Sequence, residues 1–175
     1  PNLPVKNLKD NISNIASEFY NHPSKKINLI GVTGTNGKTS SVYWITQCLK
    51  HLERKATMIS TIGYGFIDNL QPTLNTTPDA LKIQSIINDF SFNQVQDTCI
   101  EVSSHGIKQS RVSGVDFDVR VFTNLSRDHL DYHNSIESYA NTKKDFPLDA
   151  KKGTLVINID DPLGKKIFQE SKLDE

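Results

Sequence analysis

Seven residues near the start of the chain have the types and spacing that phosphate binding needs: Thr33-Gly34-Thr35-Asn36-Gly37-Lys38-Thr39. Glycines allow a tight turn whose backbone N–H groups aim inward at an anion, and the start of a following helix adds positive potential. A lysine neutralises the outer phosphates, and a threonine hydroxyl suits a magnesium ion that bridges them. This segment, called the phosphate loop below, predicts that the chain binds a ligand with several phosphate groups together with Mg²⁺.

The spacing of these residues departs from the strict phosphate-loop pattern. That pattern has four residues between its first glycine and the Gly-Lys pair, but Val32 stands at the first position and Gly31 lies one residue too early. An ordinary structural turn is therefore the alternative. The order of an apolar run, a glycine loop and an amphipathic run favours phosphate binding, because such loops join a strand to a helix.

Alternating strands and helices must position this loop. Apolar runs typical of buried strands cover residues 27–32, 56–61, 98–102, 119–123 and 155–159. Helices are predicted over 12–19, 42–52, 78–90, 135–144 and 163–170, either from the helical spacing of apolar residues or from a capping residue followed by proline. For the helix over 78–90 the predicted cap is Thr77, before Pro78. This alternation predicts an α/β fold with a mainly parallel sheet flanked by helices on both faces.

Ligands of such sheets bind beyond the carboxyl ends of the strands. Glu101 closes one predicted strand, where its carboxylate would reach a magnesium ion also held by Thr39. A solvated acid at a strand end is the alternative. His129 and His133 have the spacing of a helical zinc pair, although no glutamate stands between them, and a neutral imidazole also accepts structural hydrogen bonds.

Composition limits the class of protein. The 175 residues, 36% of them hydrophobic, suit one domain with a buried core, and no repeat or linker divides them. Twenty basic residues balance twenty acidic ones, so no overall field attracts nucleic acid or an anionic membrane. Cys48 and Cys99 both lie in apolar segments, which predicts core packing rather than a disulfide. Without a membrane-length apolar run or a leader-like start, we expect a cytoplasmic protein with small-molecule partners.

Four motifs in one order resemble the Mur ligase family, whose members join an amino acid to a carboxylate with ATP. They are the phosphate loop, Asn75-Thr76-Thr77-Pro78, Glu101-Val102-Ser103-Ser104-His105, and residues 122–133, and residues 156–161 extend the similarity. The resemblance implies that residues 1–175 are the central ATP-binding domain, with a phosphate-loop NTPase-like fold. It also implies partner domains in the same full-length chain: an N-terminal UDP-binding domain and a C-terminal amino-acid-binding domain.

The same resemblance assigns roles to individual residues. Catalytic roles fall to Lys38, Glu101, His129 and Lys143, and metal binding to Thr39, Glu101, His129 and Lys143, the lysine as a carbamate formed with carbon dioxide. The residues implied to bind ATP are Gly34, Thr35, Asn36, Gly37, Lys38, Thr39, Ser40, Asn158 and Asp161. Those implied to bind the other substrate are Asn75, Thr76, Thr77, Ser103, Gln109 and Arg111.

Several of these residues also have purely structural interpretations. The role of the Thr77 hydroxyl could be limited to capping a helix, and Asn158 and Asp161 could simply form a polar turn. Lys143 could be a solvated helical lysine. Neighbours on a helix point about 100° apart, so only one of Lys143 and Lys144 can face the site. The spacing of four residues from Tyr139 selects Lys143.

The branch of the family that these motifs resemble acts in peptidoglycan biosynthesis. The resemblance implies an ADP-forming ligase that phosphorylates UDP-N-acetylmuramoyl-L-alanyl-D-glutamate to an acyl phosphate and then couples L-lysine or meso-diaminopimelate to it. Two alternatives stay open at this point. One is a folylpolyglutamate-type ligase with the same ATP chemistry, and the other is a nucleotide-binding module without catalysis.

Overall fold

The computed structural model describes residues 6–126, 136–149 and 153–171. Within these ranges the chain forms a sheet with the strand order β4-β3-β2-β5-β1-β6-β7. Five strands run parallel: β1 (Asn28–Thr33), β2 (Ala56–Ser60), β5 (Asp97–Glu101), β6 (Val119–Phe122) and β7 (Thr154–Ile157). The predicted α/β fold with a mainly parallel sheet is therefore confirmed.

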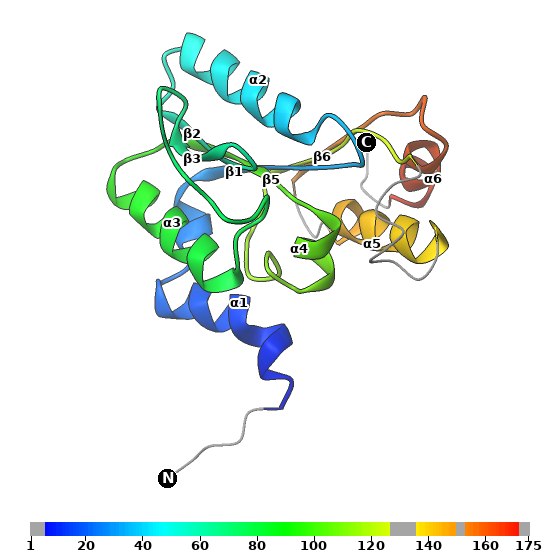
Figure 1. Ribbon diagram of the computed structural model, residues 1–175, viewed down its shortest axis with the longest axis horizontal. Coiled ribbons are helices and arrows are strands. Elements are labelled where there is room, and N and C mark those ends of the chain that lie inside the picture. Colours follow the sequence, from blue (N-terminus) through cyan, green and yellow to red (C-terminus); the bar gives the residue numbers. More distant parts are fainter. Residues whose placement is uncertain (1–5, 127–135, 150–152, 172–175) are drawn as a thin grey trace.

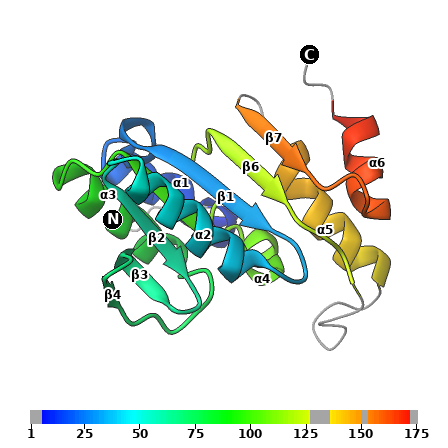
Figure 2. The same cartoon turned by 90° about the horizontal axis from the view of Figure 1, so that it is seen from above.

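Helices cover both faces of this sheet. Figure 1 shows α2 (Lys38–His51) on one face and α1 (Leu8–Phe19), α3 (Ala80–Phe92), α4 (Ser104–Lys108) and α5 (Ile136–Leu148) on the other. A 3₁₀ turn (Pro23–Lys26) precedes β1, and α6 (Pro162–Glu170) follows β7. Seen from above in Figure 2, the parallel strands point the same way, so their carboxyl ends meet at one edge of the sheet. No helix in these described ranges is long and apolar enough to cross a membrane.

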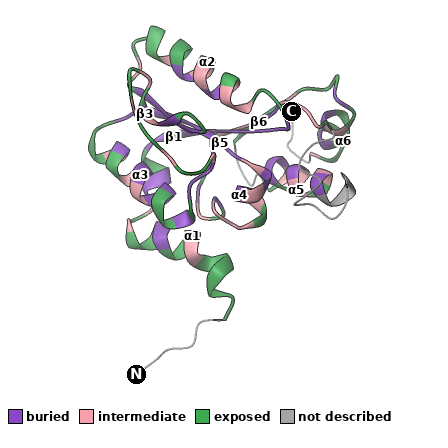
Figure 3. Cartoon of the chain, viewed as in Figure 1, coloured by how far each residue is buried: buried purple, intermediate pink, exposed green. Residues whose placement is uncertain are grey.

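The core follows the two-residue period of the strands. Leu29, Ile59 and Ile100 face the layer that holds α3 and α5, while Val32, Met58 and Cys99 face α2. Figure 3 shows the buried strands between more exposed outer helix faces. Burial raises the pKa of the Cys99 thiol to about 12. Both cysteines are free, and the expected core position of Cys48 is wrong, because α2 turns that residue outward to solvent.

Two local expectations need correction. A short antiparallel hairpin, β3 (Gly63–Phe66) and β4 (Asn69–Gln71), extends the sheet beyond β2. It was not predicted, since strands this short carry little apolar signal and β3 also contains two glycines. Thr77 is not a helix cap. Helix α3 begins at Ala80, and the side chain of Asp79 accepts a hydrogen bond from the backbone N–H of Lys82 at 2.9 Å.

Candidate nucleotide-binding and ligase site

The phosphate loop joins β1 to α2 at the carboxyl edge of the sheet (Figure 1). Gly37 adopts a left-handed conformation, with φ of 80°, and α2 begins at the next residue. Gly34 has a φ of 150°, and a Cβ added to it would lie 1.9 Å from the Thr123 hydroxyl. Both glycines are therefore required, one by backbone conformation and the other mainly by a close approach to the loop after β6.

The loop after β6 holds the phosphate loop in shape. Asn124 accepts from the backbone N–H of Thr35 at 2.8 Å with its carbonyl and from that of Asn36 at 3.0 Å with its side chain. Its amide group donates in return to the Asn36 carbonyl at 3.1 Å. These bonds occupy two N–H groups near the start of the loop. The phosphate-facing positions are thus the N–H groups around Gly37, Lys38 and Thr39, at the start of α2.

Lys38 lies folded back over the loop. Its ammonium group donates to the carbonyls of Gly34 at 3.1 Å and Thr35 at 2.8 Å. Carbonyl oxygens are weak partners for a full positive charge compared with a phosphate. The lysine is therefore well placed to exchange these contacts for those of a bound anion.

Glu101 is the buried acid of the site, with 2% of its surface exposed. One carboxylate oxygen accepts from the Thr39 hydroxyl at 2.9 Å and from the backbone N–H and hydroxyl of Thr61, each at 3.1 Å. Strand β5 lies between β1 and β2, so the residues that follow those two strands reach Glu101 from either side. Among the residues that the structure describes, no group of three His, Cys, Asp or Glu side chains converges.

Helix α5 brings a second lysine to the phosphate loop. Lys143 is 1% exposed, and its ammonium group donates to the Gly34 carbonyl at 2.6 Å. Tyr139, one turn earlier, contacts the Thr35 hydroxyl at 3.2 Å through its own hydroxyl. Lys144 points elsewhere and pairs with Glu170 of α6. Of the two adjacent lysines, Lys143 thus lies against the loop, as the spacing from Tyr139 predicts.

A pocket of about 430 Å³ opens beside these groups. Lys38, Glu101 and Lys143 line it together with residues from two sequence motifs, Asn75, Thr76, Thr77, Ser103, Ser104 and His105, and with Thr61 and Arg111. The pocket therefore gathers most of the residues that the sequence assigns to the second substrate.

Hydrogen bonds within the pocket wall fix the positions of Thr77 and Arg111. The Thr77 hydroxyl donates to the Glu101 carbonyl at 2.7 Å and accepts from the backbone N–H of Ser103 at 2.9 Å, which fixes the turn after β5. Gln109 does not line the pocket. Its side-chain oxygen accepts from the Nε and Nη2 groups of Arg111, at 3.0 and 2.7 Å, and so orients that guanidinium.

Other predicted site residues lie elsewhere. Asn158 donates to the Thr123 carbonyl at 2.9 Å, and Asp161 caps α6 while accepting from the backbone N–H of Leu125 at 2.8 Å. Ser40 is exposed in the first turn of α2. His129 and His133 lie outside the described residues.

Sequence reasoning did not assign Thr61, Tyr139 and Asn124 to the site. Thr61 and Asn124 both follow the end of a parallel strand, which is the signal that identified Glu101. Tyr139 served only to select Lys143 by its spacing. Position relative to strand ends would therefore have found two of these three residues.

A parallel sheet that carries a glycine loop and a helix after an inner strand defines an α/β domain of the phosphate-loop class. Residues 32–175 match the family described as the Mur ligase middle domain. This chain belongs to that family.

Relatives and solved structures agree with this placement. The chain is 44% identical to the UDP-N-acetylmuramoyl-L-alanyl-D-glutamate–2,6-diaminopimelate ligases of Pseudomonas putida and Coxiella burnetii, over 95% and 96% of its length. It spans about a third, 34%, of the length of each relative. A solved structure of a ligase with the same name has a TM-score of 0.84 at 30% identity, covering 98% of this chain and 36% of that one.

A more distant structure shares the fold alone. The Mycobacterium tuberculosis folylpolyglutamate synthase complexed with ADP has a TM-score of 0.73 at 15% identity, over 93% of this chain and 44% of that one.

Proposed function

We propose that this chain is the central ATP-binding domain, residues 1–175, of an ADP-forming ligase of peptidoglycan synthesis. The ligase phosphorylates the D-glutamate carboxylate of UDP-N-acetylmuramoyl-L-alanyl-D-glutamate to an acyl phosphate and couples 2,6-diaminopimelate to it. The observation that carries the proposal is that Lys38 and Glu101 line one pocket, with the Thr39 hydroxyl bonded to Glu101, in a chain 44% identical to ligases named for this reaction.

Charge is the main obstacle to this chemistry. A carboxylate and the terminal phosphate of ATP are both anions, so cations must bring them together. Lys38 supplies one cation from the phosphate loop. The Thr39 hydroxyl and the Glu101 carboxylate are hard oxygen donors 2.9 Å apart, and this donor set fits Mg²⁺. A bound magnesium ion neutralises phosphate charge and polarises the reacting phosphoryl group.

Lys143 contributes to the same site as a carbamate in this proposal. An ammonium group has no lone pair with which to hold a cation, whereas a carbamate formed from the amine and carbon dioxide is an oxygen anion. The burial of Lys143 beside the phosphate loop supports this role. His129 completes the proposed metal ligands and lies outside the described residues.

Further residues hold the substrates. Arg111 offers a planar fork suited to a carboxylate, and Asn75, Thr76, Thr77 and Ser103 offer hydrogen bonds in the same pocket to the muramyl dipeptide. Gln109 orients Arg111. Gly34 to Ser40 bind the phosphates, and Asn158 and Asp161 lie towards the adenosine.

The remainder of the ligase supplies the other binding walls. We propose a UDP-binding domain and an amino-acid-binding domain in the same full-length protein, in keeping with relatives about three times as long as this chain. The enzyme works in the cytoplasm, where ATP and these small-molecule substrates are found.

Phosphate release by the full-length protein tests this proposal. With ATP, Mg²⁺ and the UDP-muramyl dipeptide, we expect release that depends on an added amino acid, with diaminopimelate far above L-lysine. Release only with a folate and glutamate would instead identify a folylpolyglutamate-type ligase. ATP binding without turnover under any condition would identify a nucleotide-binding module.

A further inference from the structure

One face of α5 meets the chain from β1 to the phosphate loop at three successive points. Tyr139, Lys143 and Phe146 follow the i, i+4, i+7 spacing of a single helix face. They contact Thr35, Gly34 and Gly31 respectively, so the helix and the strand run in opposite directions along the contact. Seven helical residues rise about 10 Å and four extended residues span at most about 13 Å, which lets the contacts match in register.

The third contact leaves no room for a side chain at Gly31. A Cβ added to Gly31 would lie 2.5 Å from the Cζ atom of Phe146 and 2.8 Å from two ring atoms of Phe117. Ordinary carbon contacts are about 3.5 to 4.0 Å. The ring of Phe146 therefore packs directly against the backbone of β1, at a position where only glycine leaves enough space.

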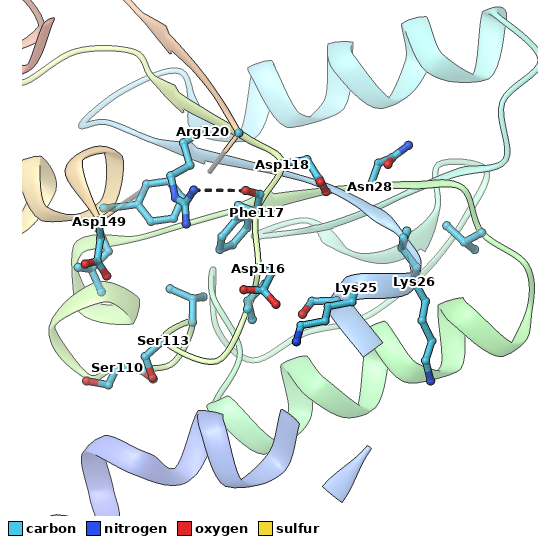
Figure 4. Close-up of a pocket in the computed structure, with 18 of the residues that line it drawn as sticks. Lys25, Lys26, Asn28, Ser110, Ser113, Asp116, Phe117, Asp118, Arg120 and Asp149 are labelled. Atoms are coloured by element: carbon cyan, nitrogen blue, oxygen red, sulfur yellow. Dashed lines mark hydrogen bonds between the residues drawn. The ribbon is translucent and has the colours of Figure 1, made fainter. Parts of the chain in front are cut away.

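The surroundings fix the Phe146 ring itself. It is 6% exposed and meets the Phe117 ring edge-on, with centroids 5.1 Å apart. The Arg120 guanidinium carbon lies 5.5 and 5.6 Å from the centroids of the Phe117 and Phe146 rings, and its Nη1 group donates to the Phe117 carbonyl at 3.2 Å. Figure 4 shows Arg120, Phe117 and Asp149 in a pocket of about 1150 Å³ whose lining includes Phe146.

The other two contacts are made to the phosphate loop and not to a strand. Thr35 and Gly34 belong to a loop whose lysine must change partners when an anion binds, whereas Gly31 is held in β1 between β5 and β6. Lys143 reaches its partner through a long side chain with four rotatable bonds, whereas a phenylalanine ring has two.

We infer that Phe146 is a positioning residue: its ring, seated on Gly31, sets how far along β1 helix α5 lies and so where the amine of Lys143 meets the phosphate loop. The inference rests on the proposed function, in which Lys143 works beside Lys38. Phe146 touches neither nucleotide nor substrate in this role.

The test uses the full-length ligase and four variants, Gly31→Ala, Phe146→Leu, Gly31→Ala/Phe146→Leu and Gly31→Ala/Phe117→Leu. A methyl group on Gly31 pushes the Phe146 ring by about 1 Å, and displacements of that size at a reacting group can cost up to 100-fold. We expect Gly31→Ala to lower kcat at least tenfold, while the KM for ATP and the Kd for ADP stay within threefold, because the phosphate-facing loop residues are unchanged.

The two double variants separate positioning from general packing. Phe117 also lies too close to the added methyl, at 2.8 Å against 2.5 Å for Phe146, but it does not belong to α5. Gly31→Ala/Phe146→Leu should recover kcat to the level of Phe146→Leu, and Gly31→Ala/Phe117→Leu should stay low, at temperatures where circular dichroism shows each protein folded.

Equal recovery in both double variants, or a kcat for Gly31→Ala within twofold of wild type, would overturn the inference. If Gly31→Ala does not fold, the comparison of the two double variants still decides. Failure of the proposed function is a distinct result, since the wild-type protein itself would then not form the amide.

Discussion

The carbonyl oxygen of Gly34 accepts hydrogen bonds from two ammonium groups, those of Lys38 and Lys143. Two cations that share one acceptor repel each other, and burial of Lys143 weakens the screening by water. This repulsion is removed when an anion binds between the two ammonium groups, or when one of them is converted to an anion. ATP phosphate meets that need at Lys38, and a carbamate would meet it at Lys143.

Lys143→Ala should therefore lower ligation by the full-length protein at least 100-fold, an effect typical of losing a charged group from a reacting site. A small added carboxylate should restore part of the activity by replacing the lost anion. Lys144→Ala is the matched control, because Lys144 pairs with Glu170 and should keep nearly full activity. The opposite pattern would move the carbamate to Lys144.

Glu101→Gln should raise the magnesium concentration needed for half-maximal activity about tenfold, since the amide keeps the shape of the acid and loses its charge. High magnesium should recover part of kcat. Lys38→Ala should fail at every magnesium concentration, because it removes a cation at the phosphates instead of a metal ligand. An unchanged magnesium titration for Glu101→Gln would remove this residue from the metal site.

Cys48 and Cys99 should differ in reactivity. The thiolate is the reactive form, and burial raises the pKa of Cys99 to about 12, well above its ordinary value of 9.0. The buried thiol thus stays protonated in the folded protein, and the stability it contributes is complete below pH 9 and falls as pH rises towards 12. Iodoacetamide at pH 8 should label only Cys48, as peptide mass spectrometry would show, and labelling of Cys99 at an equal rate would contradict its burial.

Every parallel strand and the long helices were predicted from the sequence, because each has a clear apolar run or period. It could not predict the β3–β4 hairpin, whose strands are short and whose stability comes from pairing with β2. The cap of α3 was assigned to Thr77 instead of Asp79, since both side chains can cap and only the backbone after Pro78 decides between them.

The site was predictable to a similar degree. The phosphate loop, Glu101 and the choice of Lys143 over Lys144 follow from strand ends and helical spacing. The bonds of Thr61 to Glu101 and of Asn124 to the phosphate loop join segments 40 and 88 residues apart, and pairings this distant depend on the strand order of the sheet.

The stability of helix α6 depends on one side chain at its start. The Asp161 carboxylate caps it by accepting from the backbone N–H groups of Leu163 and Gly164, and it also accepts from Leu125. Asp161→Ala should lower the free energy of unfolding by about 1 to 2 kcal/mol, the usual cost of a lost cap, in urea titrations.

Exposed Asp160 next to it is the control, and its replacement by alanine should have a much smaller effect. The affinity of the folded Asp161→Ala protein for ADP separates the two roles of this residue. A tenfold loss would support the proposed place near adenosine, and an unchanged affinity would leave only the cap.

The chain holds the phosphate loop and the proposed metal ligands Thr39, Glu101 and Lys143 but spans about a third of the length of its relatives. We expect the isolated chain to bind ADP with Mg²⁺ in calorimetry and to form amide at less than about 1% of the full-length rate. Reacting groups must be held within about 3 to 3.5 Å, and the isolated chain lacks two of the three proposed binding walls. Ligation by this chain at the full-length rate would refute the three-domain proposal.

The strand order also has a consequence for handling the isolated chain. In the part that the structure describes, β7 ends the sheet, and its Val156 is 50% exposed. A terminal strand offers a row of backbone groups to any extended segment that approaches it, including β7 of another molecule. We therefore expect the domain, when it is produced by itself, to self-associate through this sheet edge as its concentration rises. The substitution Val156→Lys should suppress this association.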